Sequence, residues 1–371
     1  MIESYGYPVE THVAQTADGY LLTMHRIPYG RAPGAGPAPN KPVVFLQHGL
    51  LCSSADWVVI GPSRALAYLL ADEGYDVWMG NARGSTHSRA HITLNPDGLL
   101  DRYEFWNFSW HEIGVYDLPA MIDYTLEATG QIKLSYVGHS QGTTSLFIML
   151  SLRPEYNNVI KSAHALAPVV FLKNLKSPLI RALAPLVDTV DTLTKLLGTS
   201  ELLPSTELMQ LGGELACRDG SPFQEVCANM WFLMSGYDSE QLNRTQLPAI
   251  MHNTPAGSAV RQLIHYVQLH KSGRFRQFDH GLLGNIGKYG SISPPDYPLS
   301  QITAPIALHF GDNDWWAAVV DVENLRSKLP NVIEYYNVPL DAFNHIDFQW
   351  AIDVKLLVYN NLLNIIRMYD N

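Results

Sequence analysis

The pentapeptide Gly138-His139-Ser140-Gln141-Gly142, directly behind the apolar run 134–137, is the feature that most constrains this chain. A strand that ends in G-x-S-x-G and turns into a helix presents a serine hydroxyl on a sharp, strained turn. Side chains two residues before and after the serine would collide with the neighbouring strand and helix, so glycine is needed there. Residues 143–152 are compatible with the required helix. We therefore expect Ser140 to be a nucleophile.

Short apolar runs alternate with longer amphipathic runs along the chain, which is typical of a parallel sheet covered by helices. The expected strands are Val43–Gln47, Asp76–Met79, Ser135–Val137, Ser162–Ala165, Ile306–Phe310 and Ile333–Val338, and the expected helices are Pro62–Asp72, Leu118–Ala128, Thr143–Leu152 and Asp321–Lys328. Val9–Ala14 and Tyr20–Ile27 predict a β-hairpin before the sheet. With the serine motif at a strand end, this order predicts the α/β-hydrolase fold, a mostly parallel sheet with helices on both faces.

The alternation breaks between about Val169 and Thr303. The best pattern there is helical: apolar residues follow Pro185 at spacings of four, three and four, namely Leu186, Val190, Leu193 and Leu197. A chain of 371 residues is longer than a protein with one simple hydrophobic core usually is. We expect a hydrolase core made of residues 1–168 and 304–371, with residues 169–303 inserted as a helical cap or lid.

Composition narrows the class of protein. Hydrophobic residues make up 47% of the chain and charged residues 16%, which describes a well-packed globular protein. The net charge of −10, without long runs of like charge, argues against nucleic acid and against tight binding to anionic lipid. No apolar stretch approaches the ~18–20 residues of a membrane span. Residues 1–6 lack the features of a signal peptide, so we expect either a cytosolic protein or a sequence that begins near a mature start.

A nucleophilic serine needs a histidine to take its proton and a carboxylate to orient that histidine. The apolar strand 306–310 ends in Gly311-Asp312-Asn313-Asp314. We expect Asp314 to be the acid and keep Asp312 as the alternative. A calcium-binding or merely solvated loop is disfavoured, because only two acids are present there.

The histidine is expected after the last strand. His345 lies 31 residues beyond Asp314, with one helix and one strand between them, which brings both over the same end of the sheet. Asp347 could be mistaken for the acid, but it comes one helix and strand too late. We expect it to make a structural hydrogen bond.

Two backbone N–H groups should stabilise the oxyanion of the tetrahedral intermediate. One is expected from Gln141, the residue after the nucleophile, and the other from the loop that follows strand 43–47. His48-Gly49 fits the bend of that loop, and Leu50 is the expected donor. His48 itself is expected to be a structural imidazole and not a catalytic one.

Three cysteines are present. Cys217 and Cys227 are ten residues apart in a polar stretch and could close a disulfide, which would favour a secretory compartment. Cys52 would then be unpaired, and we expect a small buried hydrophobe there and not a reactive thiol.

The chain resembles the acid lipases, the family of gastric lipase, lysosomal acid lipase and many insect relatives. The matching segments span nearly the whole chain and are Phe45–Leu51, Gly74–Trp78, Gly80–Gly84, Glu104–Trp106, Tyr116–Ala120, Gly138–Thr144, Ala165–Pro168, Gly311–Asp314 and His345–Phe348. The resemblance implies a catalytic trio of Ser140, Asp314 and His345, with Leu50 and Gln141 as oxyanion donors. It also implies a disulfide between Cys217 and Cys227.

The family is secreted or lysosomal, is N-glycosylated, and cleaves long-chain acyl esters of glycerol or sterols. The resemblance implies the same setting here. Asn243-Arg244-Thr245 is the better glycosylation site, since Asn107-Phe108-Ser109 lies between two tryptophans and is expected to be buried. Trp315-Trp316 replaces smaller aliphatic residues of relatives, and could pack against the cap or reshape one wall of the acyl site.

These features predict a serine-dependent lipase or esterase that works through an acyl-enzyme, with no cofactor or metal. The expected partner is a lipid ester at a lipid–water interface, and we expect a monomer without a membrane span or nucleic-acid partner. A silent lipid carrier or yolk-type storage protein on the same fold is the alternative, although such proteins usually lose a member of the trio. A serine peptidase or thioesterase is a further alternative.

Overall fold

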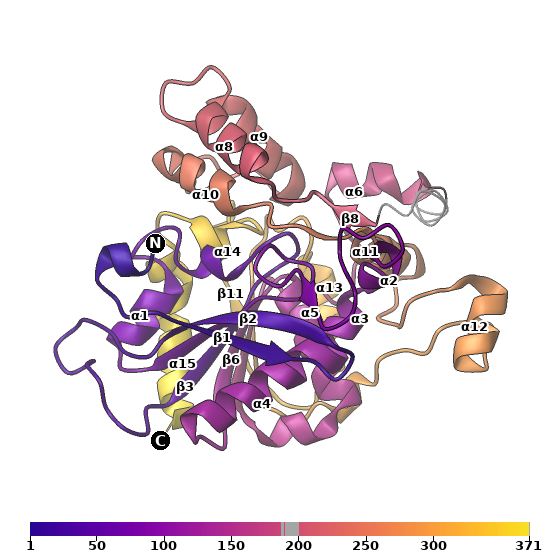
Figure 1. Ribbon diagram of the computed structural model, residues 1–371, viewed down its shortest axis with the longest axis horizontal. Coiled ribbons are helices and arrows are strands. Elements are labelled where there is room, and N and C mark those ends of the chain that lie inside the picture. Colours follow the sequence, from indigo (N-terminus) through magenta and orange to yellow (C-terminus); the bar gives the residue numbers. More distant parts are fainter. Residues whose placement is uncertain (187–188, 190–199, 371) are drawn as a thin grey trace.

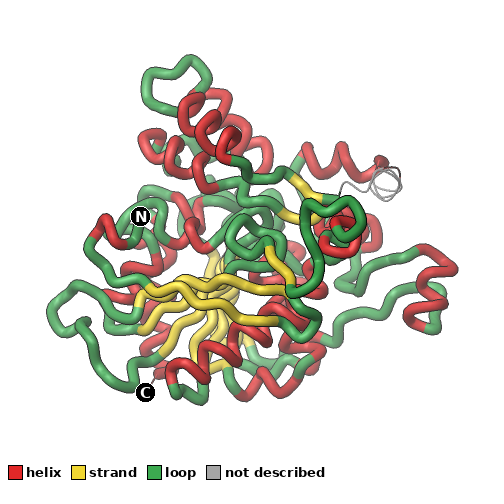
Figure 2. The backbone as a smooth tube through the Cα atoms, viewed as in Figure 1, coloured by secondary structure: helices red, strands yellow, loops and turns green. Residues whose placement is uncertain are grey.

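The computed structural model describes residues 1–186, 189 and 200–370. In this part of the chain, nine strands form a sheet in the order β1-β2-β4-β3-β6-β7-β10-β11, with β5 paired to β2. The pairs that include β2 are antiparallel, and the strands from β4 to β11 are parallel. Figure 2 shows the strands as a layer with helices around it. The expected mostly parallel sheet with covering helices is confirmed.

The strand positions follow the sequence pattern closely. The strands are β1 (Glu10–Gln15), β2 (Tyr20–Ile27), β3 (Val43–Gln47), β4 (Asp76–Gly80), β5 (Ala90–His91), β6 (Leu134–His139), β7 (Ile160–Leu166), β10 (Ile306–Phe310) and β11 (Val332–Asn337). Every residue of β3, β4, β6 and β10 is buried, because helices cover both faces of the sheet. The six predicted strands and the hairpin are confirmed to within two residues at each end, and among the described strands of this sheet only the short β5 was not predicted.

Helices cover both faces of the sheet (Figure 1). On one side lie α1 (Leu66–Asp72) and α15 (Asn360–Asp370), joined by a hydrogen bond from Arg367 to Glu73. On the other side α4 (Leu118–Thr129) packs against α5 (Gln141–Leu152). Further along the chain, α13 (Val319–Arg326) packs against β10.

The prediction for α1 was wrong at its start. The helix was expected from Pro62 and begins only at Leu66. The N–H groups of Arg64 and Ala65 both donate to the Gly61 carbonyl, at 3.1 and 2.8 Å, so these residues form a turn before the helix. The C-terminal α15 was not predicted, although it buries one apolar face, made of Leu362, Leu363, Ile365 and Ile366.

Residues 169–303 contribute no described strand to this sheet. Their elements are α6 (Pro178–Leu183), β8 (Glu201–Leu202), α8 (Glu207–Cys217), α9 (Gln224–Ser235), α10 (Leu247–Asn253), β9 (Ser258–Ala259), α11 (Val260–Ser272) and α12 (Gly281–Tyr289). In Figure 1, α8, α9 and α10 form a group above the sheet, and α12 extends to the right. Of the predicted cap helix, Pro185 and Leu186 lie in a short 3₁₀ turn (Ala184–Leu186), and Val190, Leu193 and Leu197 lie outside the described residues.

Cys217 and Cys227 form a disulfide, as the resemblance implied. The bond joins the last residue of α8 to the first turn of α9. It therefore fixes the geometry of a helix pair whose outer side chains are exposed, a place where packing alone provides little stability.

Short elements complete the chain. They are α2 (Arg102–Phe105), α3 (Trp110–Glu112), α14 (Asp347–Trp350), π-helical turns at Ile113–Asp117 and Lys355–Tyr359, and 3₁₀ turns at Glu3–Tyr5, Ser54–Trp57, Pro154–Asn158, Arg244–Gln246 and Leu299–Gln301. Among the described helices, none has the length and apolar character that crossing a bilayer requires.

Candidate active site

Ser140 lies on a sharp turn between β6 and α5, with φ 52° and ψ −116°. A side chain on Gly142 would lie 2.4 Å from the Gln47 carbonyl oxygen of β3, and one on Gly138 would lie 2.9 Å from the Gly142 backbone. Positive φ is unfavourable for a residue with a side chain, so the surrounding backbone must hold the serine in this conformation. The predicted requirement for two glycines thus has a direct steric cause.

A continuous hydrogen-bonded relay connects three of the predicted residues. Ser140 Oγ lies 2.7 Å from His345 Nε2, and His345 Nδ1 lies 2.9 Å from each oxygen of Asp314. The ionised carboxylate of Asp314 can only accept a hydrogen bond, so His345 Nδ1 must carry a proton and donate that bond. His345 Nε2 is then free to accept from the serine hydroxyl. This is the protonation state that a general base needs.

The carboxylate of Asp314 is fixed by its own loop. Its Oδ1 accepts hydrogen bonds from the backbone N–H groups of Trp316 and Ala317, both at 2.8 Å, and the side chain is fully buried. The alternative acid, Asp312, is exposed and accepts from the Asn337 side chain at 3.1 Å. Of the two predicted acids, the structure therefore brings only Asp314 to the histidine.

The two predicted oxyanion donors flank the serine. A side chain on Gly49 would lie 3.0 Å from Ser140 Cβ, so the turn leading into Leu50 passes directly beside the nucleophile. Gln141 is the first residue of α5. The first N–H groups of a helix have no partner within it, so the Gln141 amide is available to a ligand at the serine.

Two further histidines surround this group, and their tautomers follow from backbone partners. His48 Nδ1 donates to the Gly49 carbonyl at 2.8 Å, while its Nε2 accepts from the Ala82 N–H at 3.0 Å. Burial lowers the pKa of His48 to about 4, so the ring is neutral. Both nitrogens are engaged by backbone groups, in agreement with the expected structural role.

His139 is the residue before the serine. Its Nε2 donates to the backbone carbonyl of His345 at 2.9 Å, and burial lowers its pKa to about 3. The strand that presents the nucleophile is thereby bonded to the loop that presents the histidine.

Asp347 makes the structural hydrogen bond that was expected of it. Its Oδ2 accepts from the Asn344 N–H at 2.7 Å, and the Asn344 side chain accepts in return from the Ile346 and Asp347 N–H groups. Burial raises the pKa of Asp347 well above its usual range. These bonds shape the turn that presents His345.

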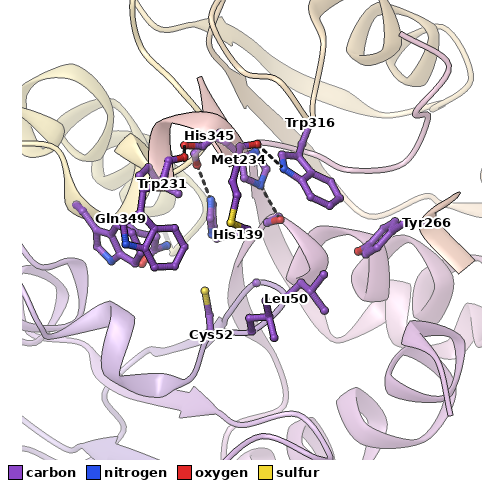
Figure 3. Close-up of a pocket in the computed structure, with 15 residues that line it drawn as sticks. Leu50, Cys52, His139, Trp231, Met234, Tyr266, Trp316, His345 and Gln349 are labelled. Atoms are coloured by element: carbon purple, nitrogen blue, oxygen red, sulfur yellow. Dashed lines mark hydrogen bonds between the residues drawn. The ribbon is translucent and has the colours of Figure 1, made fainter. Parts of the chain in front are cut away.

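The serine faces a cavity of about 60 Å³ (Figure 3). From the core, its walls are Gly49, Leu50, Leu51, Cys52, His139, Ser140, Trp316, His345, Ile346, Gln349 and Trp350, and from residues 169–303 they are Trp231, Met234, Ser235 and Tyr266. Most of these side chains are apolar. The site is therefore suited to a hydrocarbon group next to one reactive polar centre.

The two tryptophans after Asp314 have different positions. Trp316 is a wall of the cavity, stacks near His345 at 6.1 Å between ring centroids, and donates from its indole N–H to the Met234 carbonyl at 3.0 Å. Trp316 therefore contacts residues 169–303, as one alternative stated, and also forms part of the cavity wall. Trp315 instead donates to the Asn313 side chain at 3.2 Å.

Cys52 was expected to be buried, and in this respect the prediction was wrong. It is partly exposed and lines the cavity, directly after Leu51, which has φ 62°. Its apolar surroundings and Asp56 raise the pKa of the thiol well above its ordinary value, so it is not a reactive thiolate.

Sequence reasoning missed the walls that come from residues 169–303. Trp231 and Met234 are three residues apart on α9, so both point from one helix face into the cavity. That spacing was the available signal, but an apolar pair at helical spacing is far more often core than active site. Among the described residues, no three His, Cys, Asp or Glu side chains lie close enough together to bind a metal ion.

Comparison with known proteins agrees with this geometry. The family described as alpha/beta hydrolase fold matches residues 42–348, and the partial alpha/beta-hydrolase lipase region matches residues 1–61. A solved structure from Sulfolobus solfataricus has a TM-score of 0.60 at 11% identity, covering 97% of this chain and 99% of its own, which concerns the fold alone.

Curated relatives are similar over nearly their full length. Lipase 3 of Drosophila melanogaster is 49% identical, covering 100% of this chain and 92% of its own. The gastric triacylglycerol lipase of Bos taurus is 42% identical, over 98% of this chain and 89% of its own. The lysosomal acid lipase/cholesteryl ester hydrolase of Macaca fascicularis is 39% identical, over 100% of this chain and 90% of its own. The chain therefore belongs to the α/β-hydrolase fold family and, within it, to the acid lipases.

Proposed function

We propose that this protein hydrolyses carboxylic esters of long-chain acyl lipids, such as triacylglycerols or sterol esters, through an acyl-enzyme on Ser140. The observation that carries the proposal is the relay from Ser140 through His345 to the buried Asp314, at 2.7 and 2.9 Å, inside a mostly apolar cavity. The names of the gastric and lysosomal relatives support the ester class.

In the first half of the reaction, Ser140 Oγ attacks the ester carbonyl while His345 Nε2 takes its proton. Asp314 keeps the histidine in the required tautomer and stabilises the imidazolium that forms. The N–H groups of Leu50 and Gln141 bind the oxyanion, and the loss of one such donor costs about 10²–10³-fold in rate. His345 then gives its proton to the departing alcohol, which leaves the acyl group on the serine.

In the second half, a water molecule takes the place of the alcohol. His345 removes its proton, the resulting hydroxide attacks the acyl carbonyl, and the same two N–H groups bind the second oxyanion. Collapse of this intermediate releases the fatty acid and returns the proton to Ser140. The residues described above account for both halves of the reaction.

Residues 169–303 serve in this proposal as a cap over the site. A cavity of about 60 Å³ has room for only a few water-sized groups, so a long acyl ester cannot enter without displacing cap side chains. Opening would expose apolar surface to a lipid droplet or micelle. Truncation of residues 176–204 should therefore abolish hydrolysis of long-chain esters, and full retention would contradict the proposed cap.

The proposed setting is the secretory pathway, ending outside the cell or in the lysosome. The disulfide between Cys217 and Cys227 supports an oxidising compartment. Asn243 is the proposed glycosylation site, since Thr245 beside it is exposed. At the other sequon Phe108 and Ser109 are buried, and Arg261 donates to the Asn107 side chain.

The experiment that tests the proposal is hydrolysis of short- and long-chain p-nitrophenyl esters at pH 5 and pH 7.5. The unmodified protein should hydrolyse both at one of these pH values, and Ser140→Ala should hydrolyse neither. Equal rates for the two proteins would contradict the proposal and would favour the silent lipid carrier. That alternative is not favoured by relatives named as lipases or by an intact relay.

A further inference from the structure

We infer that a second, methionine-lined groove between α8, α9 and α10 binds the acyl chain of the ester that reacts at Ser140. This inference rests on the proposed function and names a subsite for it. The groove has a volume of about 250 Å³, against about 60 Å³ for the cavity at the serine. Its walls are Leu51, Leu203, Pro204, Ser205, Met209, Gln210, Met230, Trp231, Met234, Met251 and Pro255.

The chemistry of the walls selects a hydrocarbon ligand. No charged side chain lines the groove, and four of its walls are methionines, whose thioethers adapt to flexible apolar chains. The two polar side chains, Gln210 and Ser205, hydrogen-bond to each other at 3.0 Å. They offer no convergent polar contacts for a head group, so the groove suits an alkyl chain better than a polar ligand.

The groove adjoins the cavity at Ser140, because Leu51, Trp231 and Met234 line both and form the partition between them. Two of these shared walls are fixed. Trp231 donates from its indole N–H to Met251 Sδ at 3.3 Å and packs edge-on against Trp350, while the Leu51 carbonyl accepts from the Ala256 N–H at 2.6 Å.

Met234 is the movable part of this partition. Its carbonyl is held by the Trp316 indole, but its side chain makes no polar bond in the described structure and has an unbranched, flexible stem. In Figure 3 it extends from α9 toward His139, between Trp231 and Trp316. A rotation of this side chain would join the cavity to the groove without moving the backbone of α9.

The direction of the groove assigns it to the acyl group. His345 must face the departing oxygen in order to protonate it, so the alcohol lies on the side of residues 345–350. None of these residues lines the groove. The groove instead begins at Leu51, next to the proposed oxyanion donor Leu50, and ends near Met209 and Met230, which are 47% and 42% exposed. A long acyl chain can therefore extend through it toward the surface.

The test compares variants that fill the groove with one that does not. Met230→Trp and Met209→Trp each add bulk in the groove, from α9 and α8. Val226→Trp adds the same ring on α9 at a site 63% exposed that lines neither cavity. The readout is the ratio of kcat/KM for p-nitrophenyl palmitate to that for p-nitrophenyl butyrate, with thermal unfolding followed by circular dichroism.

We expect the palmitate-to-butyrate ratio to fall at least tenfold in each groove variant that retains the fold, and to stay unchanged in Val226→Trp. An unchanged ratio in the groove variants would overturn the inference. An equal fall in all three variants would also overturn it, because it would point to contact of the helix surface with the micelle. If the unmodified protein hydrolyses neither ester, the proposed function fails, which this readout separates from failure of the groove alone.

Discussion

The end of the sheet and the helices above it are built in opposite ways. At the sheet, Ser140, Asp314 and His345 are all less than a tenth exposed, and backbone groups hold the turn or loop of each. On α8, on α9 and just before α9, in contrast, many large apolar side chains face solvent, among them Leu208, Leu211, Leu215, Phe223, Val226 and Leu233. The proposed reacting groups therefore lie on a rigid scaffold, while the surface proposed to meet the lipid lies on loosely supported helices.

The largest expected effect comes from the acid loop of the sheet. Asp314→Asn should lower kcat for ester hydrolysis by about 10³–10⁴-fold, because an amide does not keep His345 in the tautomer that accepts from Ser140. Asp312→Asn, two residues away and exposed, is the matched control and should retain nearly full activity. A large loss from Asp312→Asn with little loss from Asp314→Asn would reverse the assignment of the acid.

Two glycines allow the difference in packing to be measured directly. Gly142→Ala should lower the free energy of unfolding by about 3 kcal/mol, since the new methyl group would lie 2.4 Å from the Gln47 carbonyl. Gly212 lies inside α8 with nothing within 4 Å of an added Cβ, so Gly212→Ala should raise stability by about 0.5–1 kcal/mol. Urea denaturation measures both, and equal effects would contradict the contrast between the two regions.

Removal of the disulfide should act on the helices and leave the sheet intact. Cys217 and Cys227 are ten residues apart in the sequence, and closing a loop of this length stabilises the folded protein by about 2–3 kcal/mol. Replacing both cysteines by serine removes this stabilisation. Hydrogen exchange should become faster in α8 and α9 and stay unchanged in β3 and β6. Faster exchange throughout the sheet would show that the two regions unfold as one unit.

The last expected effect concerns pH and two histidines inside the sheet. His164 and His309 are fully buried with ring nitrogens 3.4 Å apart, and burial lowers both pKa values, that of His309 to about 3. The unfolded chain binds these protons near its ordinary pKa of about 6.5, so the stability they contribute is complete above pH 6.5 and is lost as pH falls toward 3. The loss is at most about 1.4 kcal/mol per pH unit for each group.

The check is urea denaturation of the unmodified protein and of His309→Gln at pH 7.5, 5.5 and 4.5. The free energy of unfolding should fall with pH in both proteins, and the slope should be smaller in the variant. An identical slope would mean that His309 does not remain neutral in the folded protein.

Predictability from the sequence follows the same division. The strands β3 and β10 were predicted residue for residue, because runs that are buried on both faces leave a nearly continuous apolar signal. Ser140 was predicted from its glycine-flanked motif at a strand end, and Asp314 and His345 were predicted from their places after later strands. Parallel strands bring their carboxyl ends to one edge, so residues far apart in the chain meet there.

The walls of the site could not be predicted in this way. Trp231 and Met234 come from a helix whose placement over the sheet depends on tertiary packing, and no local pattern encodes that placement. Cys52 was predicted to be buried since cysteine usually is, but it follows Leu51, which has a left-handed conformation, and lines the cavity. A single-residue conformation of this kind leaves no periodic signal in the sequence.

The central claim is that Ser140 forms the covalent intermediate with the help of His345 and Asp314. Mass spectrometry after incubation with a p-nitrophenyl alkylphosphonate tests it most directly, because the phosphonate esterifies an activated serine and releases p-nitrophenol. We predict one adduct per chain, on the peptide that contains Ser140, and no adduct in Ser140→Ala or His345→Ala. An adduct on another residue, or ester hydrolysis that continues after Ser140 has been fully esterified, would contradict the account.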